Sequence, residues 1–290
     1  MARLATLLWA LTAIAVGLSL NGCRTIETAP GDDRVLAIAH RGGKAPGYSE
    51  NTLPALRRAI DLGVDVIELD LRVTLDKHTV IIHDSTLDRT TNGKGRVREH
   101  TLEMIRELDA GYGERVPTFE EVLDLVQGQP VMLLLDIKKG RRLDCPAVVA
   151  AIEARDLVGQ VIIGARTIED VQMFRPLNRN IPILAFVEST HDIDDFISHG
   201  VDIIRLWSSW IGPDASPVHH VLQRGPSVWV TALGADRAKV KWLAQFGVEG
   251  VVLDRPELIV GAQAVPLATI QRSVLTNVRS ISINSKPQDL

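Results

Sequence analysis

Short, unbroken runs of valine, isoleucine and leucine recur along most of this 290-residue chain, and amphipathic segments separate them. Such runs are typical of parallel strands buried on both faces, and the segments between them have the pattern of surface helices. Repeated alternation of strand and helix predicts a parallel sheet with helices packed against it. The predicted strands span residues 35–39, 66–71, 80–82, 131–137, 161–163, 181–187, 203–206, 228–231 and 250–253.

The number of predicted strands indicates which parallel sheet forms. Nine candidates for eight positions, in a chain long enough for one large domain, favour an α/β fold of the TIM (β/α)8 barrel type. The runs at 66–71 and 80–82 are too close for a crossover helix, so they form a hairpin or are joined by an irregular loop. An open doubly wound sheet is the alternative, but the chain has no glycine fingerprint to support it.

Polar residues stand at the ends of the first four predicted strands. In a barrel, the loops that follow the strands build the active site. A single carboxylate at a strand end usually caps a helix or accepts a hydrogen bond from a loop, but four polar endings in succession are hard to explain by packing. They are His40 and Arg41, Glu68 and Asp70 in "VIELDLR", His83 and Asp84, and Asp136 and Lys138 in "VMLLLDIKKG".

Three of these side chains are carboxylates that a barrel would bring together: Glu68, Asp70 and Asp136. Two unit charges about 4 Å apart repel by about 4 kcal/mol at an effective dielectric constant of about 20. Three such pairs predict a cation among them, and an all-oxygen ligand set favours a divalent metal, Mg²⁺ or Ca²⁺. A carboxylate cluster that shares a proton is the alternative.

The basic residues at the strand ends suit an anionic substrate. His40 and His83 can act in turn as acid and base, and Arg41 and Lys138 offer positive charge to a phosphate. Together with a metal, they are suited to a phosphodiester. The substrate is expected to be a small molecule rather than nucleic acid, because the net charge is -4 and the basic residues are scattered.

The segments "AHRGGKAPGYSENT", "VIELDLR", "VIIHDSTLDRTTNGKG", "VPTFEEVLDLV", "LLLDIKKG" and "GVEGVVLDRPE" follow one another in this order. In them the chain resembles the glycerophosphodiester phosphodiesterase family, a group of metal-dependent TIM-barrel enzymes. The resemblance implies His40 and His83 as the acid/base pair, Glu68, Asp70 and Asp136 as metal ligands, and Arg41 and Lys138 as phosphate contacts. It also implies a place beside the metal for Glu50, whose alternative role is that of a carboxylate at a helix start.

The implied reaction is hydrolysis of a glycerophosphodiester to sn-glycerol 3-phosphate and an alcohol, through a cyclic phosphate. Two departures keep alternatives open. Asp136 replaces the glutamate that is commoner in the family, which is similar to phospholipase D toxins and suggests action on lysophospholipids or sphingomyelin. In "WVTALGAD", Trp229 is displaced by one position, so it either lines the pocket or packs in the core. A non-catalytic envelope lipoprotein that binds a ligand is the third alternative.

The two ends of the chain are predicted to lie outside the barrel. Residues 1–23 have the pattern of a signal peptide, and "LNGC", ending at Cys23, resembles a bacterial lipobox. This pattern predicts a lipoprotein of the cell envelope, anchored by lipid on Cys23 and facing the periplasm from the outer membrane; a periplasmic or secreted protein is the alternative. Residues 24–34 are a predicted linker, 35–260 the barrel domain and 261–290 a peripheral tail. The oligomeric state is left open.

Overall fold

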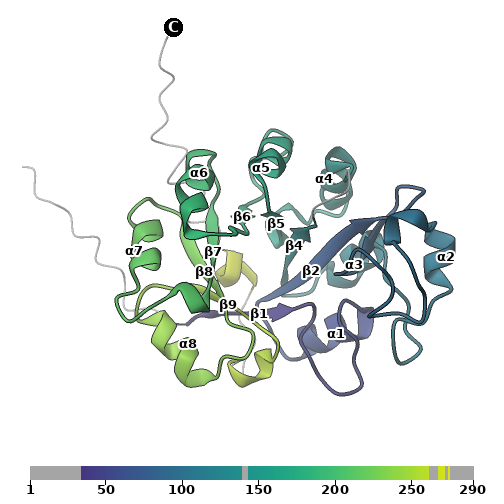
Figure 1. The fold of residues 1–290 in the computed structure, drawn as a ribbon, viewed down its shortest axis with the longest axis horizontal. Helices are drawn as coiled ribbons and strands as arrows, with labels where there is room; N and C mark the ends of the chain where they lie inside the picture. The colour runs from purple at the N-terminus through teal and green to yellow at the C-terminus, as the bar shows by residue number, and fades with distance from the viewer. Residues whose placement is uncertain (1–33, 139–142, 261–266, 272–273, 275–290) are drawn as a thin grey trace, which may run out of the picture. The chain divides into compact units, whose positions relative to one another are not determined.

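The computed structural model describes residues 34–138, 143–260, 267–271 and 274. Its centre is a closed barrel of parallel strands surrounded by helices (Figure 1). The first strand pairs with both the second and the last, which closes the sheet. The prediction of a TIM barrel is therefore confirmed. Around the barrel the strands are β1 (Leu36–His40), β2 (Val66–Val73), β4 (Met132–Ile137), β5 (Val161–Ala165), β6 (Ile183–Ala185), β7 (Ile203–Trp207), β8 (Ser227–Thr231) and β9 (Gly250–Leu253).

The remaining described strand, β3 (Thr79–Ile81), pairs antiparallel with the end of β2. This pairing decides in favour of the hairpin over an irregular loop. Residues 82–117 then leave the barrel as an excursion with its own small core, before the chain returns through α3 (Phe119–Val126) to β4. The excursion contains η1 (Val97–Glu99) and α2 (Leu102–Arg106).

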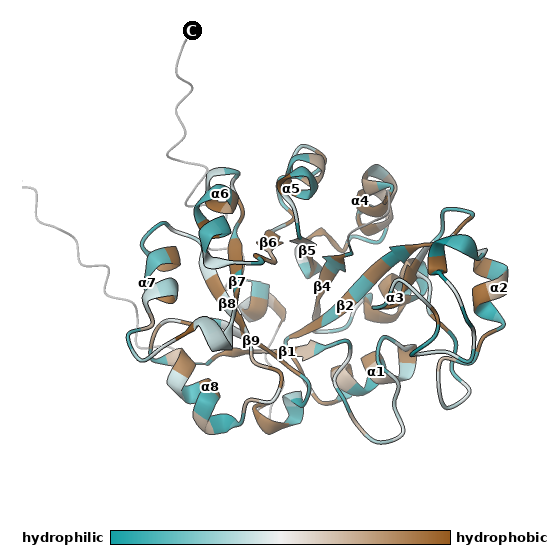
Figure 2. Cartoon of the chain, in the orientation of Figure 1, coloured by the Kyte–Doolittle hydropathy of each residue, from teal (hydrophilic) through white to brown (hydrophobic). Residues whose placement is uncertain are grey.

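Helices cover the outside of the barrel because each presents an apolar stripe to the sheet. Local signals fix several helix starts: Thr118 and Thr167 form capping boxes with Glu121 and Asp170. Figure 2 shows apolar residues along β7 and β8 and mixed colouring on the surrounding helices. Besides α3, these are α1 (Leu53–Asp61), α4 (Cys145–Glu153), α5 (Ile168–Phe174), α6 (Ile193–Ser198), α7 (Ser216–Leu222) and α8 (Arg237–Ala244), with the 3₁₀ turns η2 (Val158–Gln160), η3 (Thr190–Asp192), η4 (Ser208–Trp210) and η5 (Pro256–Leu258).

The barrel interior has a separate core from the layer between sheet and helices. It contains residues from the starts of strands, such as Leu36, Met132 and Ile203, together with Trp229. Ile270 and Val274 belong to the same buried cluster. These two residues therefore pack with the interior cluster, whose other members come largely from the starts of the strands.

Buried carboxylates tie strands together at the end of the barrel where the strands begin. Asp65 accepts hydrogen bonds from the backbone of Ala37 at 2.8 Å and from Arg34 at 2.7 Å. Asp202 does the same for the backbone of Ile183 at 2.8 Å and for Arg175 at 2.6 Å. In this fold, polar residues at the start of the strands serve stability, and the opposite end carries the chemistry.

The predicted signal peptide, Cys23 and nearly all of the predicted linker lie outside the described residues, and so does most of the predicted tail. Within the described ranges, no helix combines the length and apolar character needed to cross a bilayer. The predicted domain boundaries stay predictions.

Candidate active site

Three buried carboxylates meet at the end of the barrel where the strands finish. Glu68 and Asp70 lie on β2, and Asp136 is the register partner of Asp70 on β4. Their side chains come from residues that are 3%, 0% and 1% exposed. Each offers an oxygen within 4.8 Å of the others. This donor set fits a hard divalent cation such as Mg²⁺ or Ca²⁺.

Two cationic side chains offset part of the negative charge of this acidic cluster. Nζ of Lys138 lies 2.7 Å from Oδ1 of Asp70 and also contacts Asp136. Arg166, the residue after β5, donates to both oxygens of Asp136 from Nε and Nη2, each at 2.6 Å. These two cations offset part of the repulsion between the carboxylates, and the cluster of Glu68, Asp70 and Asp136 still fits a divalent metal.

Glu68 and Asp136 lie in different environments, which move their pKa values in opposite directions. Burial, reinforced by the charge of Asp70, raises the pKa of Glu68 to about 7. The pKa of Asp136 lies below its ordinary value. Burial alone would raise this pKa, but the hydrogen bonds from Arg166 and the charge of Lys138 have the larger effect. Asp136 is thus ionised, and a cation bound beside Glu68 would favour the charged form of Glu68.

His40 ends β1 and is the register partner of Glu68. Its Nδ1 lies 2.7 Å from Oδ1 of Asp254, and Nζ of Lys44 lies 2.7 Å from the other oxygen of that carboxylate. The pKa of Asp254 is lowered, because the effect of these two partners is larger than that of burial, which alone would raise it. An ionised carboxylate only accepts hydrogen bonds, so Nδ1 of His40 carries the hydrogen and Nε2 is left for the substrate.

His83 follows β3 and repeats this arrangement. Its Nδ1 lies 2.7 Å from Oδ1 of Asp84, and its carbonyl accepts a hydrogen bond from Nε of Arg72 at 2.8 Å. Burial lowers the pKa of His83 below the ordinary histidine value. The ring is therefore neutral at pH 7, with Nε2 able to take a proton.

Arg41 begins a tight turn after β1 with a φ of 54°, and glycines follow it. Its backbone N–H donates to Glu68 at 3.0 Å, and its Nη1 donates to Glu50 at 2.8 Å. Its Nε lies 3.3 Å from Oδ2 of Asp70, which also accepts from Asn51 at 2.7 Å. The turn thus places a guanidinium at the edge of the acidic cluster.

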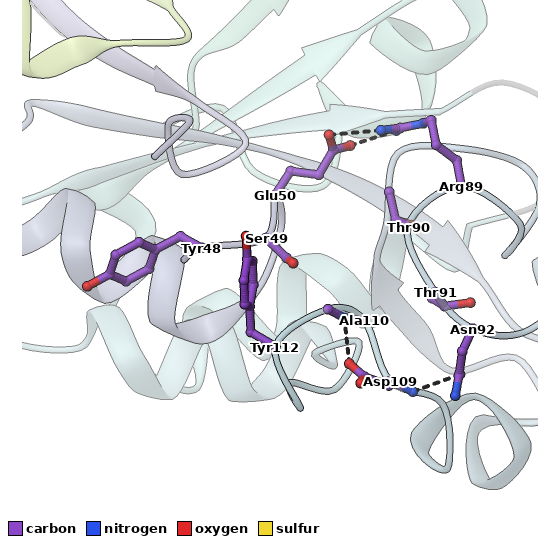
Figure 3. A pocket seen from close by; sticks show the side chains of 11 residues that line it. Tyr48, Ser49, Glu50, Arg89, Thr90, Thr91, Asn92, Asp109, Ala110 and Tyr112 are labelled. Carbon is purple, nitrogen blue, oxygen red and sulfur yellow. Dashed lines mark hydrogen bonds and ion pairs between the residues drawn. The ribbon is translucent and has the colours of Figure 1, made fainter. Parts of the chain in front are cut away.

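Glu50 is engaged by two arginines. Besides Arg41, it accepts from Nη1 and Nη2 of Arg89 at 3.0 and 2.7 Å. Arg89 also donates to Asp84, the partner of His83, at 2.7 Å. Figure 3 shows the contact between Glu50 and Arg89 at the edge of a cavity of about 560 Å³, which Tyr48 and Tyr112 also line. The cavity therefore adjoins the site through Glu50.

Trp229 lies in the barrel interior and is 1% exposed. Of the two roles that the sequence left open, this burial favours the core. Trp207, which ends β7 and is 39% exposed, is an aromatic residue at the open end. The ring of Trp207 lies 4.4 Å from the guanidinium carbon of Arg205.

The sequence analysis missed several residues that contact the site. Arg166 follows β5 and Asp254 follows β9, so both stand at strand ends and carry the same signal as His40. Arg205, in the middle of β7, does not. The pairings of Asp254 with His40 across 214 residues and of Arg89 with Glu50 across 39 residues give no local signal.

Comparison with known proteins agrees with this geometry. The model of the glycerophosphoryl diester phosphodiesterase family matches residues 40–258. The chain belongs to this family. The predicted enzyme class, a phosphoric diester hydrolase of the glycerophosphodiester phosphodiesterase type, is confirmed with it.

Relatives from bacteria support the family assignment. The chain is 31% identical over 243 residues to the putative glycerophosphodiester phosphodiesterase YhdW of Bacillus subtilis. This match spans 77% of this chain and 96% of that protein. It is 47% identical over 114 residues to a glycerophosphodiester phosphodiesterase of Caldanaerobacter subterraneus, a match that spans 37% of this chain and about half, 46%, of that relative.

Solved structures of the family have the same fold. A glycerophosphodiester phosphodiesterase from Agrobacterium tumefaciens is 28% identical, with a TM-score of 0.66 over 78% of this chain and 99% of its own. A phosphodiesterase from Oleispira antarctica, solved with the product sn-glycerol-3-phosphate, has a TM-score of 0.65 at 22% identity, over 77% of this chain and 94% of its own. At that identity the second likeness supports the fold alone.

Proposed function

We propose that this family member hydrolyses glycerophosphodiesters to sn-glycerol 3-phosphate and an alcohol. The observation that carries the proposal is the pair of histidines, each fixed through Nδ1 by a carboxylate 2.7 Å away. His40 is the register partner of Glu68, and the backbone N–H of Ile82, next to His83, donates to the carbonyl of Asp70. Both rings are thus anchored beside the carboxylates of β2.

Glu68, Asp70 and Asp136 are proposed to hold a divalent metal, Mg²⁺ or Ca²⁺. Their mutual distances and all-oxygen chemistry support this role. When bound, the ion would offset negative charge that grows on the phosphoryl oxygens. Arg41 and Lys138, at the edge of the same cluster, are proposed to contact the phosphate, with Glu50 orienting Arg41.

The two histidines are proposed to exchange protons with the substrate at Nε2. One takes the proton of the glycerol 2-hydroxyl, whose oxygen forms a bond to phosphorus. The bond from phosphorus to the alcohol oxygen breaks, and the other histidine donates a proton to that oxygen. Water then opens the resulting cyclic phosphate with the two roles reversed.

The test is formation of sn-glycerol 3-phosphate from glycerophosphocholine and glycerophosphoethanolamine, with Mg²⁺, with Ca²⁺ and with chelator. We expect chelator to abolish turnover and His40→Ala to lower kcat by about 10²- to 10⁴-fold. His220→Ala is the matched control, because that histidine pairs with Asp194 on the surface. Activity that survives both chelator and His40→Ala would refute the proposal. Lysophospholipid and sphingomyelin, assayed in parallel, test the phospholipase D-like alternative that Asp136 suggests.

We also propose that the chain is an envelope lipoprotein anchored through Cys23, which rests on the sequence pattern of residues 1–23. Mass spectrometry of the protein from a bacterial host, with and without Cys23→Ser, tests this proposal. A lipid-modified N-terminal cysteine in the unaltered chain is the expected result. An unmodified soluble form would show that the chain is secreted.

A further inference from the structure

Arg205 is a buried cation without a hydrogen-bond partner for two of its nitrogens. It lies in the middle of β7 and is only 3% exposed. In the described part of the chain, Nε and Nη1 have no hydrogen-bond partner. Buried polar atoms are nearly always hydrogen-bonded, so an orphaned guanidinium indicates a missing ligand.

The position of Arg205 directs it toward the acidic cluster. In the closed strand order, β7 lies four strands from β2 in either direction, so the two strands face each other across the barrel. Burial and the charge of Arg166 lower the pKa of Arg205 to about 10, whereas the charges of Asp136 and Glu68 act in the opposite direction. The side chain therefore remains a cation at neutral pH and interacts with the far wall.

Aromatic rings hold the guanidinium in place. Its central carbon lies 5.1 Å from the ring centroid of Phe186 and 4.4 Å from that of Trp207. Such contacts favour a cation without using its N–H donors, which remain available.

Among the described residues, three other cations beside the cluster are already paired. Lys138 contacts Asp70 and Asp136, and Arg166 binds Asp136 with two hydrogen bonds. Arg41 is paired with Glu50. An anion that approached these three would compete with carboxylates, whereas Nε and Nη1 of Arg205 are free of such pairs.

We propose that Arg205 binds a non-bridging oxygen of the substrate phosphate, from the wall opposite β2. This inference rests on the proposed function, because the phosphate supplies the anion. A guanidinium suits a phosphate, because it keeps its charge at neutral pH and its N–H groups donate charge-assisted hydrogen bonds to the anion. Zwitterionic substrates such as glycerophosphocholine have no other anionic group, so Arg205 selects for the phosphate rather than for the alcohol.

The competing explanation is that Arg205 only offsets the charge of the three carboxylates. In that case its loss would change the affinity for Mg²⁺ but would leave phosphate binding unaltered. The two explanations therefore differ in which ligand responds to a substitution at this position.

The test is calorimetric binding of inorganic phosphate to the Mg²⁺-loaded full chain, compared between wild type, Arg205→Met and Arg205→Lys. We expect Arg205→Met to weaken phosphate binding by about 10-fold or more, with Arg205→Lys between it and the wild type. Arg205→Gln replaces the methionine variant if that variant does not fold. Arg224→Met is the matched control, because Arg224 pairs with Asp194 on the surface.

Unchanged phosphate affinity in a folded Arg205→Met protein, or no phosphate binding by the wild type, would overturn the inference. Turnover of glycerophosphodiesters by the wild type is measured separately. If the wild type hydrolyses these diesters and Arg205→Met has the phosphate affinity and KM of the wild type, the inference about Arg205 is wrong and the proposed function stands. A wild type that binds phosphate through Arg205 but hydrolyses none of the diesters contradicts the proposed function alone.

Discussion

The imidazole of His40 and the carboxylate of Asp254 lie 2.7 Å apart, although 214 residues separate them along the chain. They meet because β1 and β9 are neighbours at the closure of the barrel. The orientation of His40 therefore depends on a strand pairing that forms only when the last strand is in place.

Replacing Asp254 with asparagine should lower kcat while the protein stays folded. An amide can present its N–H₂ group to Nδ1, which favours the wrong tautomer of His40. We expect a loss of roughly 10- to 100-fold, the size seen when carboxylate partners of functional histidines are removed. Steady-state assays and thermal melting measure this effect. Lys44→Met, which removes only the other partner of Asp254, is the control and should have a much smaller effect on kcat.

The pH profile of kcat/KM should reflect the environment of His83. Burial lowers its pKa, so the acidic limb should lie below the ordinary histidine pKa of about 6.5. The hydrogen bond that His83 donates to Asp84 acts in the opposite direction, so Asp84→Asn should move this limb to still lower pH. Rates measured across the acidic range check both statements. A limb that moves to higher pH in Asp84→Asn would contradict this assignment.

Arg89 should make the fold sensitive to acid. Hydrogen bonds from Arg89 lower the pKa of Asp84. At Glu50, burial acts to raise the pKa, but the hydrogen bonds and charges of Arg89 and Arg41 together outweigh it and lower the pKa. For a lowered acid pKa, the stabilisation is present above the unfolded value of about 4 and is lost as the pH falls through the folded value. Arg89→Met should therefore flatten the fall in melting temperature below about pH 4. Arg155→Met, which removes an arginine paired with Asp124 on the surface, should keep the slope of the wild type.

Metal binding should stabilise the protein through Glu68. A ligand present at about 100 times its Kd adds about 2.7 kcal/mol to the free energy of unfolding. Melting with Mg²⁺, with Ca²⁺ and with chelator should show this shift in the wild type, and Glu68→Gln should reduce it. Equal shifts in both proteins would exclude Glu68 as a ligand.

The far end of the barrel should affect stability and not chemistry. Asp202→Ala leaves the buried N–H of Ile183 without its acceptor and removes the anionic partner of Arg175. Orphaned buried donors of this kind cost roughly 1–3 kcal/mol each, so denaturant unfolding should shift accordingly. The kcat of the folded fraction should equal that of the wild type, and a loss of kcat would contradict the separation of the two ends.

Local pattern was sufficient to predict the barrel and the carboxylates of β2 and β4, because strand alternation and strand endings are properties of short segments. It was insufficient for contacts between distant segments. Asp254 beside His40 and Arg89 beside Glu50 depend on which strands and loops the barrel brings together. Trp229 is a further example. The segment "WVTALGAD" did not decide whether this side chain lines the pocket or packs in the core, because that depends on the packing of the whole barrel.

Ile270 and Val274 complete the barrel interior from beyond the last strand. A nascent chain on the ribosome therefore lacks part of its own apolar interior until residue 274 has been synthesised. A gene shortened at residue 260 would remove two apolar side chains from the buried interior cluster. Expression vectors for this enzyme should therefore extend past residue 274.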